Sequence, residues 1–237
     1  MAANSLLYKS KYEINENISI LIPTVGQVLE DEEKYYGLLY LLTATPFDLM
    51  VALDDAGLDF TKLTDYDLFC FLFPGIATED TSLIFEDLDL SKFRPAIDIK
   101  SNSKVFIDTE RDIKIDEEIY NKIAYGLRAI HHLEPCRKKP GNEEARRYLI
   151  ERARKKLNRR RTKKYKSQME PLIVAMVNSE QYKYNFEETK SLSIYQFNES
   201  VRQILRKVEY DNKMYGVYSG TIKASDLSPD EFNWISI

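Results

Sequence analysis

The sequence has little of what several protein classes require. Its 237 residues include two cysteines, Cys70 and Cys136, too few for a disulfide scaffold, so we expect a protein of a reducing compartment. Only eight glycines and eight prolines occur, which argues against a fibrous or low-complexity chain. No apolar run approaches the roughly 18–20 residues that cross a bilayer, and no apolar stretch follows a basic start. We therefore expect neither a membrane protein nor a secreted one.

The common signatures of catalysis are also missing. The two histidines, His131 and His132, are adjacent at a predicted helix end and point to different faces, so with Cys136 they complete no tetrahedral metal set. The sequence contains neither a nucleophile elbow nor a phosphate-binding glycine loop. Nuclease-type Asp-x-Lys triplets begin at Asp98 and Asp112, but acid-x-Lys spacing recurs elsewhere in this charge-rich chain, so chance explains it. We expect no enzyme, no metal and no cofactor.

What the sequence does have is a core and a strong separation of charge. Apolar residues make up 43% of the chain, enough to bury a core. Residues 1–133 carry 12 Lys+Arg against 24 Asp+Glu, whereas residues 136–166 carry 15 Lys+Arg against three Asp+Glu. This opposition predicts contacts with partners or between the two parts of the chain.

Strand and helix signals alternate in the first part of the chain. The pattern predicts a hairpin over 8–23 and a small antiparallel sheet within 81–115, to which the hairpin can add. The first β-prone run of that sheet is Ser82–Phe85. N-cap threonines begin three predicted helices: Thr24 through Leu42, Thr45 toward Asp55, and Thr64 to Phe73, the last stopped by Pro74. A further helix is predicted after acids at 116–118, with apolar residues from Ile119 to Ile130 at helical spacing.

A break at 135–141, with Pro135 and Pro140-Gly141, is the best domain boundary in the sequence. Helix patterns alone follow it: a basic helix over about 143–165, an apolar helix over 168–178, a periodic helix behind Ser193 and a last turn after Ser228. We therefore expect an α+β fold. An acidic N-terminal domain of helices and a small antiparallel sheet spans 1–134, and an all-helical region spans 142–237.

The basic helix is the first candidate interaction site. Its charges surround most of the helix, leaving a narrow apolar stripe. Three alternatives stay open: contact with nucleic-acid phosphates, docking on an acidic protein, and packing against this chain's own acidic part. Only Tyr148 and Tyr165 are available for base stacking, which disfavours single strands. The candidate basic surface comprises Arg147, Arg154, Arg159, Arg160, Arg161, Lys163 and Lys164.

The periodic helix behind Ser193 is the second candidate. Its stripe of Ile194, Phe197, Val201, Ile204, Leu205 and Val208 is typical of a core, and we expect Phe197, Val201, Ile204 and Val208 to hold the region together. The aromatic residues that follow make the helix apolar over more than one side. A small helical region cannot bury all of that surface, so we predict a partner-binding or self-association surface. Its candidate residues are Tyr210, Met214, Tyr215, Tyr218 and Trp234.

The C-terminal residues resemble a phage pattern. The stretches that carry the resemblance are Leu192–Val201, Arg206–Asp211, Gly216–Gly220 and Phe232–Ile235, with support from Met176–Asn178 and, in the first part, Lys34–Tyr36 and Leu41–Asp48. They are similar to phage proteins of the tail morphogenesis cluster that are described as tail assembly chaperones.

This resemblance implies a non-enzymatic protein of the infected host's bacterial cytoplasm. Members of that family bind the tail tube and tape measure proteins during tail assembly, and some are made in short and long forms by ribosomal frameshifting. One alternative is a structural tail or baseplate component that stays in the virion. A second is a nucleic-acid-binding protein that uses residues 136–166.

Overall fold

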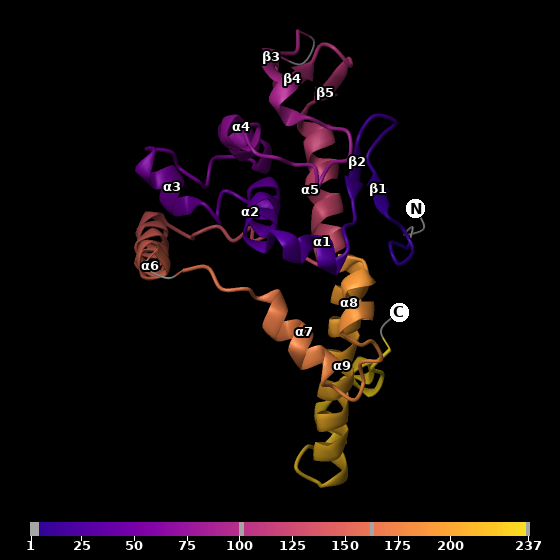
Figure 1. The fold of residues 1–237 in the computed structure, drawn as a ribbon. Coiled ribbons are helices and arrows are strands. Elements are labelled where there is room, and N and C mark those ends of the chain that lie inside the picture. Colours follow the sequence, from indigo (N-terminus) through magenta and orange to yellow (C-terminus); the bar gives the residue numbers. More distant parts are fainter. Residues whose placement is uncertain (1–4, 100–101, 162–163, 236–237) are drawn as a thin grey trace.

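The computed structural model describes residues 5–99, 102–161 and 164–235 (Figure 1). Its helices are α1 (Val25–Glu30), α2 (Glu32–Thr43), α3 (Met50–Asp55), α4 (Asp65–Ile76), α5 (Glu117–His131), α6 (Glu143–Arg161), α7 (Met169–Val177), α8 (Phe186–Ser191) and α9 (Ile194–Tyr218). Its strands are β1 (Lys11–Glu13), β2 (Ser19–Leu21), β3 (Arg94–Ile97), β4 (Lys104–Asp108) and β5 (Ile113–Ile115). Short 3-10 turns are η1 (Leu90–Lys92), η2 (Ala224–Asp226) and η3 (Pro229–Phe232). The predicted α+β class is confirmed.

The strands form two separate antiparallel sheets, β1-β2 and β3-β4-β5. The hairpin therefore does not join the second sheet. The prediction of a strand over Ser82–Phe85 is wrong, because a turn closes there: the Ile84 and Phe85 amides both donate to the Thr81 carbonyl. This segment meets the hairpin through an isolated bridge between Phe85 and Ile20 and a hydrogen bond from the Leu21 amide to the Ile84 carbonyl.

Helix starts agree with the capping signals more often than helix ends do. Thr24 and Gln27 form the predicted capping box, but Asp31 ends α1 and caps α2, so one predicted helix is two. The amide of Thr45 donates to the Asp48 carboxylate in a closed turn. Helix α3 therefore begins at Met50 and not, as predicted, directly after Thr45. Helix α4 continues through Pro74, contrary to prediction. A proline in the last turn removes only one backbone hydrogen bond, so the helix tolerates it there.

Helix α5 runs through the centre of the molecule, with α2 and α4 on one side and the hairpin on the other (Figure 1). Aromatic rings fill the space beside it: the Phe69 and Tyr120 rings stack with centroids 4.4 Å apart, and those of Phe73 and Phe106 stack at 3.8 Å. Contacts between aromatic rings add to the stabilisation that burial of the rings supplies.

The C-terminal helices share this main core. Met169, Ile173 and Met176 of α7 and Ile194 and Phe197 of α9 are buried in the same cluster as the residues around α5. The segment 135–141 therefore separates two stretches of chain that pack into one core. The division of the chain into a domain over 1–134 and a helical region over 142–237 stays a prediction.

A buried carboxylate fixes the place of α7. Glu32, at the start of α2, accepts hydrogen bonds from the backbone amides of Gln168 and Met169, with N–O distances of 2.9 and 3.2 Å, and from the Ser167 hydroxyl. Burial opposes ionisation of Glu32, but these donors outweigh burial and lower its pKa. One acidic side chain thus satisfies the first amides of a helix far away in the sequence.

At Gly126 of α5 the side chains of the hairpin pack directly against the central helix. A Cβ atom there would stand 2.7 Å from the Tyr12 ring and 2.9 Å from Cδ1 of Ile20. We expect Gly126→Ala to lower the free energy of unfolding by about 1–3 kcal/mol, because overpacking displaces the hairpin. Gly37→Ala, on an exposed side of α2 with open space around it, is the matched control and should stabilise slightly. Equal denaturation midpoints for the two variants would contradict this packing.

Candidate functional site

Helix α9 leaves the core part-way along its length. Its Ser193–Gln196 capping box and the fully buried Ile194 and Phe197 fix its first turn. From there the helix extends away from the body of the molecule (Figure 1). Leu205, on the extended part, is 62% exposed.

The C-terminal tail after α9 folds back onto this extended part. Backbone amides of Thr221 and Ile222 donate to the Gly216 carbonyl at 2.9 Å, and the Ile222 side chain fills the space above Gly216. Lys213 Nζ lies 2.9 Å from Oε1 of Glu231. Hydrogen bonds from Lys213 and from the Ser228 backbone lower the pKa of Glu231 to about 2.

The tail covers only part of α9. Val208, Tyr215 and Tyr218 follow one another at seven and then three residues, so they lie on one side of the helix. Their side chains are 39%, 76% and 85% exposed. We call these three residues the distal α9 surface.

The other predicted partner-binding residues are less exposed than Tyr215 and Tyr218. Met214 is buried, Tyr210 is half-buried and Trp234 is 37% exposed. Lys207 Nζ of α9 lies 5.8 Å from the ring centroids of both Tyr210 and Trp234, so the Trp234 ring of the tail lies beside this part of α9.

The structure corrects the predicted stripe on α9 in its second half. Phe197 is buried, and Val201 and Ile204 are half-buried against the core, as expected. Val208 and Leu205 are exposed, because α9 continues beyond the end of the core while the apolar spacing of its sequence continues. Sequence reasoning also missed Phe232 and Ile235, which are exposed on the tail; the apolar motif Phe232–Ile235 was the available signal.

The basic helix α6 lies at the edge of the molecule and packs on α3 (Figure 1). Ile150 is buried in a second apolar cluster with residues of α3. Arg154 binds Asp54 and Asp55, with N–O distances of 2.7 and 2.5 Å, and Arg146 lies 3.6 Å from Asp59. Packing against the chain's own acidic part therefore accounts for one side of α6.

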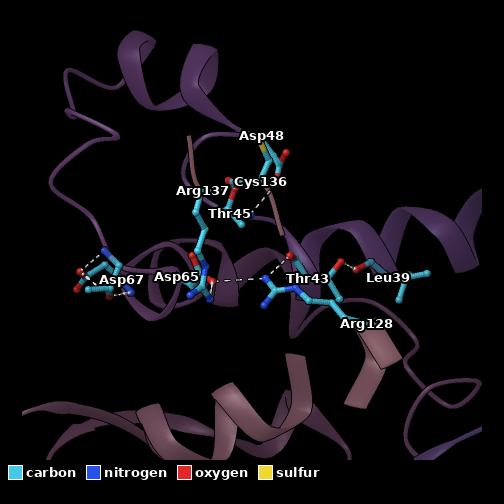
Figure 2. A network of polar contacts seen from close by, with 10 residues as sticks. Leu39, Thr43, Thr45, Asp48, Asp65, Asp67, Arg128, Cys136 and Arg137 are labelled. Atoms are coloured by element: carbon cyan, nitrogen blue, oxygen red, sulfur yellow. Dashed lines mark hydrogen bonds and ion pairs between the residues drawn. The ribbon is translucent and has the colours of Figure 1, made fainter. Parts of the chain in front are cut away.

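A polar network holds the segment that leads into α6. Figure 2 shows Arg128 of α5 and Arg137 converging on Asp65 at the start of α4, with N–O distances of 3.4 and 3.1 Å. Arg128 also donates to the Thr43 carbonyl at 2.6 Å, and the Thr45 hydroxyl donates to the Cys136 carbonyl at 2.8 Å. These contacts give Cys136 and Arg137 a structural place and fix where the basic segment begins.

Several residues of the predicted basic surface face solvent. Arg147 is exposed and its Nε lies 3.2 Å from Oε1 of Glu143. Arg159 and Lys164 are exposed as well. Lys163 and the side chains of Arg160 and Arg161 lie outside the described residues.

The two histidines occupy different environments. His131 is buried and its Nε2 lies 2.9 Å from the Tyr35 hydroxyl; burial lowers its pKa to about 3. His132 caps α5 in the left-handed conformation, with φ 53°, and its Nε2 lies 3.3 Å from Oε1 of Glu199. Within 5–99, 102–161 and 164–235, no group of three or more His, Cys, Asp or Glu side chains is arranged to hold a metal ion.

Asp98 and Lys114, which belong to the two Asp-x-Lys triplets, form an ordinary surface ion pair. Nζ of Lys114 lies 3.2 Å from Asp98 and 3.1 Å from Asp116. Asp112 is exposed in a turn with φ 52°. Across the part of the chain that the structure describes, none of the helices combines the length and apolar character that crossing a bilayer requires.

Comparison with known protein families finds a similarity in the C-terminal part of the chain. Residues 161–237 match the family model described as the YomV second domain, a phage-derived family. No curated protein and no solved structure matches the chain. The match supports a phage relationship and carries no statement about tail assembly or chaperone activity. It includes α7, α8, α9 and the tail, so the C-terminal region that bears the distal α9 surface is similar to the second domain of the phage-derived YomV family.

Proposed function

We propose that this protein is a non-enzymatic assembly factor of a phage, which binds a tail protein in the host cytoplasm during virion morphogenesis. The observation that carries the proposal is the distal α9 surface. It places large apolar side chains in solvent, on a helix that extends from the core, inside the region similar to a phage-derived domain.

Such a surface suits a protein partner. Tyr215 and Tyr218 are large, rigid side chains, and aromatic anchors supply much of the binding free energy at protein interfaces. An amphipathic helix that presents residues at spacings of three and seven can lie in an apolar groove of another protein. The resemblance of the sequence to tail assembly chaperones selects the tail tube and tape measure proteins as the partners to test.

We expect Tyr215→Ala combined with Tyr218→Ala to weaken association with the tail tube or tape measure protein by at least tenfold while leaving the fold intact. Replacement of exposed side chains changes stability by only about 0.5 kcal/mol, whereas loss of an interface anchor costs about 2 kcal/mol or more. Co-purification and thermal melts of the same preparations measure the two effects.

The matched control is Tyr8→Ala combined with Tyr125→Ala, which removes two tyrosines that are 89% and 66% exposed elsewhere on the surface. The control should keep full association. If both double variants retain every association, or if the Tyr215 and Tyr218 variant unfolds, the distal α9 surface is not a docking site.

An assembly factor differs from a structural component in what remains in the particle. Mass spectrometry of purified virions distinguishes the two: we expect the chain in the lysate and absent from finished particles. Stoichiometric recovery from particles would instead assign it to the tail or baseplate. Self-association through the same surface would appear as a concentration-dependent mass that the Tyr215 and Tyr218 variant loses.

A further inference from the structure

Helix α6 has two sides with different surroundings. Arg146, Ile150 and Arg154 face α3, where the arginines meet carboxylates and the isoleucine is buried. On the opposite side, residues at helical spacing turn away from the protein and are all exposed. We call these the outer α6 face: Arg152, Lys155 and Lys156.

The ion pairs that join α6 to Asp54, Asp55 and Asp59 lie on the inner side of the helix. Arg154 lies against Asp54 and Asp55, the acids of α3 nearest to α6, so their charge is used on the inner side. Within the described residues, Arg152, Lys155 and Lys156 form no ion pair with a carboxylate. Exposed Lys138 and Lys139 lie just before the helix and Lys164 just after it, which extends the positive potential along its length.

We propose that the outer α6 face binds the phosphate backbone of duplex DNA, a role beyond the partner binding assigned to α9. A polyanion is the partner that complements a row of like charges, because each neutralised phosphate releases a condensed counterion. An α-helix with its side chains is about 10–12 Å wide and fits the B-DNA major groove. The major groove of A-form RNA is too narrow for a helix, which favours DNA over duplex RNA.

The composition of the face favours DNA over an acidic protein. Protein interfaces have an apolar centre and are depleted in lysine. The outer α6 face has the opposite character, since it consists of lysine and arginine, and Tyr148 is the exposed aromatic residue that precedes it on the helix. A single tyrosine also provides little base stacking, so single-stranded DNA is disfavoured.

The test measures the affinity of the full chain for a short fluorescent duplex of mixed sequence at several salt concentrations. Three phosphate contacts predict a log–log salt slope of about −2.7, which corresponds to a loss of roughly 40-fold in affinity from about 50 to 200 mM salt. Lys155→Gln combined with Lys156→Gln should reduce the magnitude of the slope by about 1.8 and lower the affinity at about 0.1 M salt by roughly 60-fold.

Lys9→Gln combined with Lys223→Gln makes the same change in net charge at exposed positions elsewhere and should leave both quantities unchanged. The proposal is overturned by any of three results: no binding at low salt, an equal loss in both double variants, or equal or tighter binding to duplex RNA or to poly-glutamate. Circular dichroism of the variants establishes that α6 remains helical. Neither tail protein takes part in the measurement, so failure here leaves the proposed assembly function unaffected.

Discussion

Replacement of Phe197 by alanine is expected to lower the free energy of unfolding by about 3–5 kcal/mol, because removal of a buried ring leaves a cavity as well as losing apolar burial. The side chain is completely buried where α9 enters the main core, and its ring meets that of Tyr182 edge-on at 6.4 Å. A loss of this size is a large part of a typical domain's stability of about 5–15 kcal/mol. Chemical denaturation measures it.

Leu205→Ala, on the same helix but largely exposed, is the matched control and should change stability by only about 0.5 kcal/mol. Because the C-terminal helices share the main core, Phe197→Ala should also expose α7 to α9 to protease. If the two variants were equally stable, the boundary between the buried and the extended part of α9 would be wrong.

Acid is expected to destabilise the protein through His131. Burial, with a smaller effect of the neighbouring His132, lowers the pKa of this imidazole from about 6.5 in the unfolded chain to about 3 in the fold. A depressed pKa means that the unfolded state binds the proton first, so this stability is fully present above pH 6.5 and is lost as the pH falls toward 3. The slope is about 1.4 kcal/mol per pH unit, or about 2 kcal/mol between pH 6.5 and 5.

Denaturation midpoints of the wild type and His131→Gln at both pH values isolate this contribution, because glutamine does not titrate. The variant should lose less stability on acidification than the wild type. His132→Gln is the companion control: burial lowers the pKa of His132 as well, but the charge of Glu199 opposes the shift. Identical acid dependence in the wild type and in His131→Gln would contradict the account of His131.

The parts of the fold that could be predicted are those with local signals. Capping boxes at Thr24 and Ser193 and an N-cap threonine at Thr64 predicted helices that begin where the structure has them. Helix α8 has the same kind of box, Asn185 with Glu188, and was missed because its six residues show no apolar period. Over Ser82–Phe85 a strand was predicted where the structure has a turn. An apolar run is typical of any buried segment, and the turn at Thr81 is closed by backbone hydrogen bonds that the side chains do not indicate.

The sequence predicted which helices carry the candidate sites, but not which of their residues are exposed or paired. A helix of 25 residues is longer than a small core can cover, and its aromatic residues lie at its end. The exposure of Tyr215 and Tyr218 therefore agrees with the sequence pattern. Periodicity does not tell where a core ends. Leu205 was therefore predicted to belong to the core stripe, and it is exposed. The pairing of Arg154 with Asp55, 99 residues away, depends on tertiary structure that charge counts do not contain.

The most direct test of the partner-binding account is hydrogen exchange of the full chain alone and with purified tail tube protein or tape measure protein. We predict that backbone amides of residues 205–218 exchange more slowly in the complex, since a docked partner suppresses local opening of this exposed helix. Amides of α5 in the centre of the core should not change. Protection elsewhere with no change over residues 205–218, or no protection by either protein, would contradict the assignment of the distal α9 surface as the docking site.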